Sequence, residues 1–280
     1  MTGAAAIGIQ RFLVIYLLLL VVLALMKRSK ISRTKLLLTA SLRMTVQLVI
    51  AGFLLTYIFE NPHPLFTAAY LFAMMGFAVH RVLSKNRDLN TGFKISIGLS
   101  LSFSGLAVLV YFVAAVVNQS LFNPQYVIPL SGMIFGNAMT GVSLGVKSFR
   151  ENTASAKERM EALLNFGVSP KNILLPFVNQ ALETAILPTL NSMVGMGIVS
   201  LPGMMTGQIL SGTLPTTAIL YQISIMVAIC TVVCLSVFGS LHFGYHTLYN
   251  KRSQFCRLGG LLTGTGCGDV KPGSGTGREK

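Results

Sequence analysis

Charged residues are scarce in this sequence of 280 residues. They make up only 11% of the chain, whereas 52% of its residues are hydrophobic, and an ordinary soluble domain carries about 25% charged residues. The mean hydropathy is +0.68, and apolar runs recur at the length that crosses a hydrocarbon core of roughly 30 Å as a helix. The shortage of charge therefore excludes an ordinary soluble protein and indicates a multi-pass membrane protein.

Other absences narrow the class further. The chain has no short segments of alternating hydrophobicity, which argues against a transmembrane barrel. It has no G-K-[ST] sequence, so the glycines near its C-terminus do not form a nucleotide-binding loop. None of its four cysteines is expected in an oxidising compartment, so no structural disulfide is predicted. We therefore expect no enzymatic activity in this chain, and any ATP must be hydrolysed by another subunit.

The apolar runs predict an all-α polytopic membrane protein with about seven transmembrane helices. The expected transmembrane domain covers residues 1–255, and the tail 256–280 is so rich in glycine that we predict it to be disordered. The seven predicted spans are roughly 7–26, 36–58, 65–83, 95–117, 127–146, 177–200 and 215–247.

The basic residues indicate how the chain crosses the membrane. Nearly all of the 22 lysines and arginines lie in the loops 27–35, 81–94 and 147–172 or in the tail, whereas the loops 60–64 and 118–125 have none. Positive residues favour the cytosolic side, so we predict an external N-terminus and a cytosolic C-terminus, in the plasma membrane. The net charge of +14 thus reflects topology and contact with membrane lipids, and no nucleic acid partner is expected.

Three polar side chains lie within predicted spans. Arg43 and Gln47 are four residues apart and share a helix face, and Glu183 lies at a similar depth in a span of the same direction. Charges within a membrane are costly and usually pair. We therefore hypothesise a contact between Arg43 and Glu183, joined by Gln180. The alternative is that Arg43 extends to the cytosolic headgroups.

The sixth span contains several residues that interrupt helices. Pro202 removes a helical hydrogen bond and Gly203 follows it, so a break is expected there. A break at membrane depth is tolerated where it lines a cavity or is buried in protein, although glycine and methionine can also simply allow close packing. The candidate translocation pathway consists of Asn191, Met193, Met196, Pro202, Gly203, Met204, Met205 and Gln208.

Two residue pairs have the spacing of metal ligands on one helix face. They are His242 with His246, and Cys230 with Cys234. Neither pair has a third ligand nearby in the sequence, so interfacial histidines and small packing residues are the favoured interpretations. Whether any of these side chains binds metal stays open, and no cofactor is predicted.

Four segments give the chain a family resemblance: PLSGMIFGNAMTGVSL, EALLNFGVSP, ILPTLNSMVGMGIVSLPGMMTGQILSG and AILYQISIMV. Together they resemble the FetB-type permeases of ATP-binding-cassette (ABC) transporters over about residues 5–255, a family whose plant relatives are linked to aluminium tolerance. The resemblance implies a permease that pairs with a separate ABC ATPase subunit and is implicated in iron export. A homodimer of permeases is the expected assembly.

The charged stretch before the sixth span predicts a cytosolic coupling helix at about 155–167. It resembles the E-A-A-x3-G loop of importer-like ABC permeases, with Glu161, Ala162 and Gly167 in matching positions. Arg159 and Glu161 would offer charges to the ATPase, and Gly167 would allow a sharp turn. The apolar face offered to the ATPase would consist of Ala162, Leu163, Leu164 and Phe166. The alternative is an ordinary charged cytosolic loop that contains a helix.

We thus expect the permease subunit of an ABC transporter that exports metal ions by alternating access. A secondary transporter should carry more buried carboxylates than Glu183 alone, and a membrane-embedded enzyme should show a nucleophile and base. A membrane subunit that regulates an ATPase without transporting anything is a further alternative. The substrate and the direction of transport are not determined by the sequence.

Overall fold

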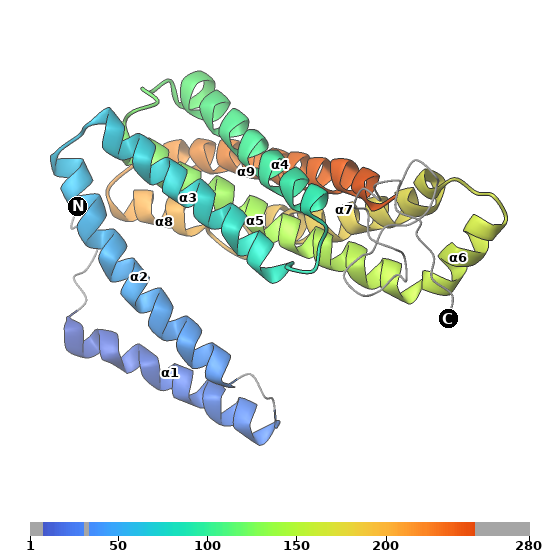
Figure 1. The fold of residues 1–280 in the computed structure, drawn as a ribbon. Helices are drawn as coiled ribbons and strands as arrows, with labels where there is room; N and C mark the ends of the chain where they lie inside the picture. The colour runs from blue at the N-terminus through green and yellow to red at the C-terminus, as the bar shows by residue number, and fades with distance from the viewer. Residues whose placement is uncertain (1–7, 31–33, 250–280) are drawn as a thin grey trace, which may run out of the picture.

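The computed structural model describes residues 8–30 and 34–249, and the predicted tail at 256–280 lies outside this part. The described chain is helical throughout and has no strands, apart from an isolated bridge between Met196 and Ser200 (Figure 1). The helices are α1 (Ile9–Arg28), α2 (Thr34–Glu60), α3 (Pro64–Lys85), α4 (Thr91–Tyr111), α5 (Pro124–Ser155), α6 (Lys157–Asn165), α7 (Pro170–Gly195), α8 (Gly203–Leu210) and α9 (Pro215–Tyr245). A π-helical turn follows α4 and a short 3₁₀ turn follows α9.

The predicted all-α membrane class is confirmed. Among the described residues, six helices are long and apolar enough to cross a membrane, and α1 is a further apolar helix of 20 residues. Each predicted span coincides with a helix, although α5 and α7 extend further toward α6 than the apolar runs suggested. The charged residues at these ends of α5 and α7 are therefore helical rather than in loops.

The chain places its turn residues where the helices begin. Pro64 and Pro124 occupy the first turns of α3 and α5, where a missing backbone N–H is tolerated. The side chains of the preceding residues, His63 and Asn123, accept hydrogen bonds from backbone N–H groups of the first turns, both at 3.2 Å. These caps define short connections on the side opposite α6.

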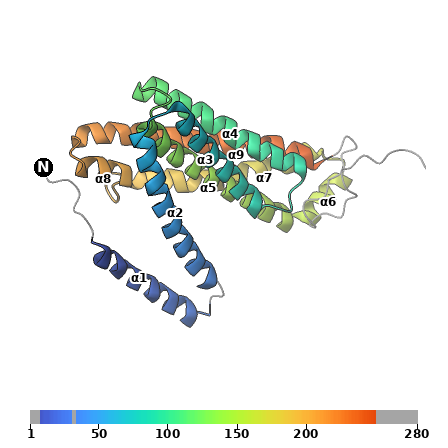
Figure 2. The same ribbon diagram turned by 60° about the vertical axis from the view of Figure 1, so that its left-hand side comes forward.

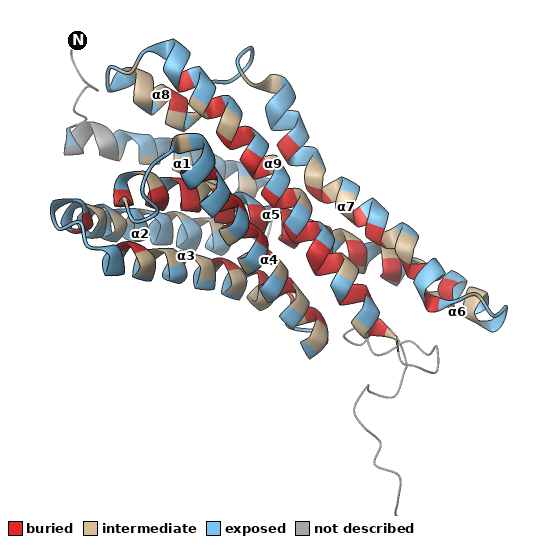
Figure 3. Ribbon diagram, turned by 90° about the horizontal axis from the view of Figure 1, so that it is seen from above, coloured by how far each residue is buried: buried red, intermediate tan, exposed pale blue. Residues whose placement is uncertain are grey.

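The core of the bundle lies between α4, α5, α7 and α9, and α3 packs on α5. Small residues allow these helices to approach closely. A Cβ atom added to Gly145 on α5 would lie 2.9 Å from Val237 of α9 and 3.3 Å from Ala185 of α7. The hydroxyl groups of Ser104 and Ser236 join α4 to α9 at 2.5 Å. Figure 3 shows the buried positions on the faces that these helices turn toward each other.

Two of the three basic loops meet the end of α9 at one end of the bundle, whereas the basic end of α1, at Lys27 and Arg28, lies apart from it (Figure 1). Arg150 of α5 forms an ion pair with Asp88 in the connection after α3, at 3.3 Å. The side chain of Asn90 donates to the carbonyl of Thr247 after α9, at 3.1 Å. The α3–α4 connection, the end of α5 and the end of α9 therefore lie together. The external placement of the N-terminus stays a prediction.

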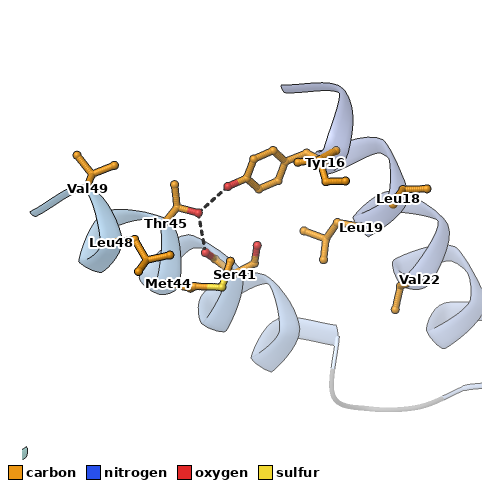
Figure 4. A pocket seen from close by; sticks show the side chains of 10 residues that line it. Tyr16, Leu18, Leu19, Val22, Ser41, Met44, Thr45, Leu48 and Val49 are labelled. Carbon is orange, nitrogen blue, oxygen red and sulfur yellow. Dashed lines mark hydrogen bonds between the residues drawn. The ribbon is translucent and has the colours of Figure 1, made fainter. Parts of the chain in front are cut away.

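Helices α1 and α2 form a hairpin that points away from the bundle (Figures 1 and 2). Ile58 is the buried residue of α2, and the hairpin exposes apolar side chains along its length. A groove of about 550 Å³ separates the two helices and is lined mainly by apolar residues, with the Tyr16 and Thr45 hydroxyl groups in hydrogen-bond contact across it (Figure 4). Such a surface suits lipid or another protein chain.

The sixth membrane segment is divided into two helices, and the division begins earlier than the sequence suggested. We predicted a break at Pro202 and Gly203, whereas α7 already ends at Gly195 and α8 starts at Gly203. Gly197 has a φ of 84°, a conformation that side chains with a Cβ rarely adopt. Its N–H donates to the carbonyl of Ser200 at 2.9 Å. Gly197 therefore contributes to the interruption together with Pro202.

Candidate functional site

Helix α6 lies at the far end of α5 and α7, where the chain turns between them (Figure 1). One side of α6 packs on the protein, with Met160 only 1% exposed and Leu163 and Leu164 against the core. The other side is exposed and presents the predicted coupling residues Arg159, Glu161 and Ala162. The predicted helix at 155–167 is therefore present as an amphipathic helix over Lys157–Asn165.

The end of α6 has the sharp turn that was predicted for Gly167. This glycine has a φ of 83°, and its N–H donates to the carbonyl of Leu164 at 2.9 Å. The N–H of Val168 donates to the carbonyl of Leu163 at 3.0 Å. Both bonds satisfy carbonyl groups that a helix end leaves without partners, as a left-handed C-terminal residue commonly does. The turn directs the chain straight into α7.

Phe166 is the residue at this end that our sequence interpretation undervalued. Its side chain is 86% exposed, although it was expected only as part of an apolar face. It follows Asn165 at the tip of α6, beside the exposed Ala162 and Arg159. An exposed aromatic ring next to a charged side chain is typical of interface residues with large contributions to binding. No sequence signal separates it from a phenylalanine that packs in the core.

The charges of α6 are held only loosely. Lys157 and Glu161 lie 3.9 Å apart, and the side chain of Glu161 is half exposed. An ion pair of this kind contributes little to stability in water. Glu161 can therefore exchange Lys157 for a basic residue of a partner at small cost.

The predicted pair of Arg43 and Glu183 does not form within one copy of the chain. None of the ion pairs among the described residues joins them, and the guanidinium of Arg43 instead lies 5.9 Å from the ring centre of Phe77. The physical reason is that α2 packs against α1 and the edge of α5. A similar depth in the membrane does not fix the direction in which two helices face. Gln47, like Arg43, is exposed on α2.

The residues of the candidate pathway lie on both sides of the break. Asn191 and Met193 are exposed near the end of α7, and Pro202 and Gly203 lie at the start of α8. Met205 is buried, and Met196 and Met204 pack partly against the core. The sulfur of Met196 accepts a hydrogen bond from Gln222 at 3.6 Å. Most of these methionines therefore serve packing in this conformation, and their role in a pathway stays a prediction.

Buried amides mark the same region. Gln222 on α9 is only 3% exposed, and the carbonyl oxygens of Gln222 and of Gln208 on α8 are buried without a hydrogen-bond partner. Unsatisfied buried oxygens are costly in an apolar setting. Buried polar groups thus lie next to the break, at Gln208 on α8 and at Gln222 on α9. Gln222 was missed in the sequence because a single glutamine in an apolar run carries no distinctive spacing.

The two histidines of α9 belong to a cluster of rings. The His242 ring stacks on Phe238 with centres 4.9 Å apart, and the rings of His242 and His246 lie 5.6 Å apart, edge to face. His246 Nδ1 lies 2.8 Å from the Tyr249 hydroxyl. Within residues 8–30 and 34–249, no three His, Cys, Asp or Glu side chains form a group that could hold a metal. Cys230 and Cys234 are half-buried free thiols.

These features define a class: a multi-pass helical membrane protein with a divided sixth segment and an exposed helix beyond the bundle. Comparison with known sequences gives the family. The chain belongs to the Uncharacterised protein family UPF0014, whose sequence profile matches residues 9–249.

Similar proteins come from bacteria and plants. The UPF0014 membrane protein slr1647 of Synechocystis is 32% identical over 83% of this chain and 90% of its own length. The protein named "Probable iron export permease protein FetB" in Escherichia coli is 29% identical over 85% of this chain and 91% of its own length. The protein ALUMINUM SENSITIVE 3 of Arabidopsis thaliana is 32% identical over 76% and 77%. No solved structure matches the chain.

Proposed function

We propose that this chain is the membrane permease subunit of an ABC transporter of the plasma membrane, driven by a separate ATPase subunit. The observation that carries the proposal is α6: an exposed amphipathic helix that ends in a highly exposed Phe166 and a left-handed Gly167. In the described part of the chain, no other element covers this surface. A helix of this kind, set across a groove of another protein, is a common mode of docking.

The connections of α6 suit it to transmit motion. It follows α5, a helix of 32 residues, and leads through the Gly167 turn into α7, a helix of 26 residues. Both helices run through the core and pack closely at Gly145. A displacement of α6 would therefore move two rigid helices together rather than being absorbed by a flexible loop.

In the mechanism we propose, two copies of the chain pair and two ATPase subunits bind at α6. Closure of the ATPase subunits on ATP displaces α6, and α5 and α7 carry the displacement to the break at residues 196–202. The break and α8 then shift between two arrangements that open the pathway to one side or the other. Such coupling requires that the partner contact the two arrangements differently.

We also propose that the exported substrate is a metal ion. The support is the relative from Escherichia coli, named as a probable iron export permease and 29% identical to this chain over nearly all of its own length. The exposed polar side chains of α5 and α7 agree with a polar substrate. Iron is therefore the first metal to test.

Co-purification tests the docking role of α6. The full chain is expressed with a candidate ABC ATPase subunit from the same genome, and the amount of ATPase recovered with it is measured. The variant Phe166→Ala should recover at least tenfold less, because it removes the exposed ring. The matched control is Phe103→Ala, which truncates a ring that is 78% exposed on α4. Equal recovery with Phe166→Ala and with the unaltered chain would contradict the proposal.

A further inference from the structure

Polar side chains occupy one flank of α7. Gln180, Glu183 and Asn191 are exposed, and Thr184 lies at the edge of the buried face. Their spacing places them along one side of the helix. The opposite flank is apolar and packs partly on the core through Leu182 and Ile186. Exposed apolar side chains, of Leu187, Leu190 and Val194, lie on the same face, so this flank mixes polar and apolar residues.

The polar flank of α7 lies on the side of α5. The hydroxyl of Ser148 on α5 donates to Thr184 Oγ1 at 3.3 Å, which fixes how the two antiparallel helices are aligned. Further along α5, Asn137 and Thr140 are exposed on the same side as Ser148. Figure 3 shows α5 and α7 running side by side with exposed positions along both. We name Asn137, Thr140, Gln180, Glu183 and Asn191 the polar strip.

Glu183 is the charged member of the polar strip. It lies about 18 Å along the helix from both Lys171 and Gly195, by the rise per residue of an α-helix. No described residue forms an ion pair or a hydrogen bond with its carboxylate. An ionised carboxylate without a partner at this depth is costly against lipid.

We infer that the polar strip of α5 and α7 lines a hydrated path between two copies of this chain, and that Glu183 binds the transported cation there. The inference rests on the proposed function, in which two copies assemble. It explains why two amides and a carboxylate of α7 lie among apolar residues on a face that one copy leaves uncovered. Two copies bring two Glu183 carboxylates to the path, whereas one copy offers a single carboxylate.

The chemistry of the strip specifies the kind of cation. Its donors are carboxylate, amide and hydroxyl oxygens, which suit hard cations such as Mn²⁺ or Fe²⁺ better than soft ones. The sulfur atoms are placed differently: Met205 is buried and the Met196 sulfur is occupied by Gln222. Met193 is the exception among these methionines, because 37% of its surface is exposed. The strip therefore selects a cation that prefers oxygen ligands over one that prefers thioether sulfur.

Binding of Mn²⁺ to the purified full chain in lipid nanodiscs tests the role of Glu183 without any ATPase. Glu183→Gln keeps the shape of the side chain and removes its charge, so it should weaken Mn²⁺ binding at least tenfold. The matched control is Glu60→Gln, which removes the charge of an exposed carboxylate at the C-terminal end of α2. This variant should bind Mn²⁺ as tightly as the unaltered chain does. No binding by the unaltered chain, equal binding by Glu183→Gln, or equal loss in both variants would overturn the assignment.

Labelling of single cysteines tests whether the strip faces water. In a variant without native cysteines, Gln180→Cys and Asn191→Cys should react with a membrane-impermeant thiol reagent at least tenfold faster than Phe103→Cys, at an exposed apolar position of α4. Reaction as slow as at Phe103→Cys would overturn the path. Both experiments are independent of α6, so loss of docking by Phe166→Ala and loss of binding by Glu183→Gln report on different claims.

Discussion

Gly167 shows how one residue can determine the connection between a docking helix and a membrane helix. Its φ of 83° suits glycine, and an added Cβ would meet no atom within 4 Å. A substitution by alanine therefore acts through backbone strain alone and not through a clash. This makes it a clean position at which to alter the turn without altering the packing around it.

We predict that Gly167→Ala loosens the end of α6. The left-handed conformation costs alanine about 1–2 kcal/mol, so the amide of Val168 should exchange its hydrogen at least about fivefold faster. Hydrogen exchange followed by mass spectrometry over residues 160–170 measures this. Gly76→Ala is the control, because Gly76 also has open space around it but lies within α3. Unchanged exchange in Gly167→Ala would contradict the role of the turn.

At the scale of single residues, the sequence predicted some features of the structure correctly and others not. The turn at Gly167 was predictable because glycine after an amphipathic helix is a common way to end it. The predicted pairing of Arg43 with Glu183 does not form. Similar depths in the sequence do not show which neighbours two helices face. The exposure of Phe166 depends on where α6 sits against the bundle, which periodicity within the helix does not reveal.

At the scale of whole elements, the division between α7 and α8 is the feature most closely tied to the proposed mechanism. Pro176 and Pro188 lie within α7 without ending it, so proline alone does not explain the break. The break is explained by two residues together: Gly197, whose backbone lies in the left-handed region, and Pro202, which precedes α8. The sequence therefore predicted that this segment is interrupted, but not the residue at which α7 ends.

We predict that Gly197→Ala impairs transport while leaving the assembly with the ATPase unchanged. The left-handed φ of 84° disfavours alanine by about 1–2 kcal/mol, which would shift the balance between the two arrangements of the break. Uptake of Fe²⁺ into inverted vesicles that contain the complex should fall at least fivefold. The control Gly52→Ala adds the same methyl group to an open position on α2. Equal uptake in both variants would contradict a moving break.

At the scale of the whole molecule, the bundle of α3 to α9 is self-contained, whereas α1 and α2 are not. The bundle buries a continuous core, but Ile58 is the buried residue of α2. Hydropathy predicted α1 and α2 as membrane helices and could not show that they form a separate hairpin, because apolar residues suit lipid and protein contacts equally. The hairpin and the polar strip are the two surfaces that an assembly of two copies would explain.

The charge pattern and the position of α6 agree with the proposed docking of an ATPase at one end of the bundle (Figure 1). The basic α3–α4 connection and the basic end of α5 lie together with the end of α9, joined by Arg150 with Asp88 and by Asn90 with Thr247. Helix α6 projects from that same end. A permease that depends on an ATPase in the cytosol requires its docking helix on the side that carries the positive charge.

The central claim is that a separate ATPase drives this chain. Its most direct test is ATP hydrolysis by the complex of the full chain and the candidate ABC ATPase subunit in proteoliposomes, with and without Fe²⁺. We predict that Fe²⁺ stimulates hydrolysis at least threefold in the complex and that the ATPase subunit alone shows no stimulation. Accumulation of Fe²⁺ by proteoliposomes that contain this chain alone, driven by an ion gradient without ATP, would contradict the claim.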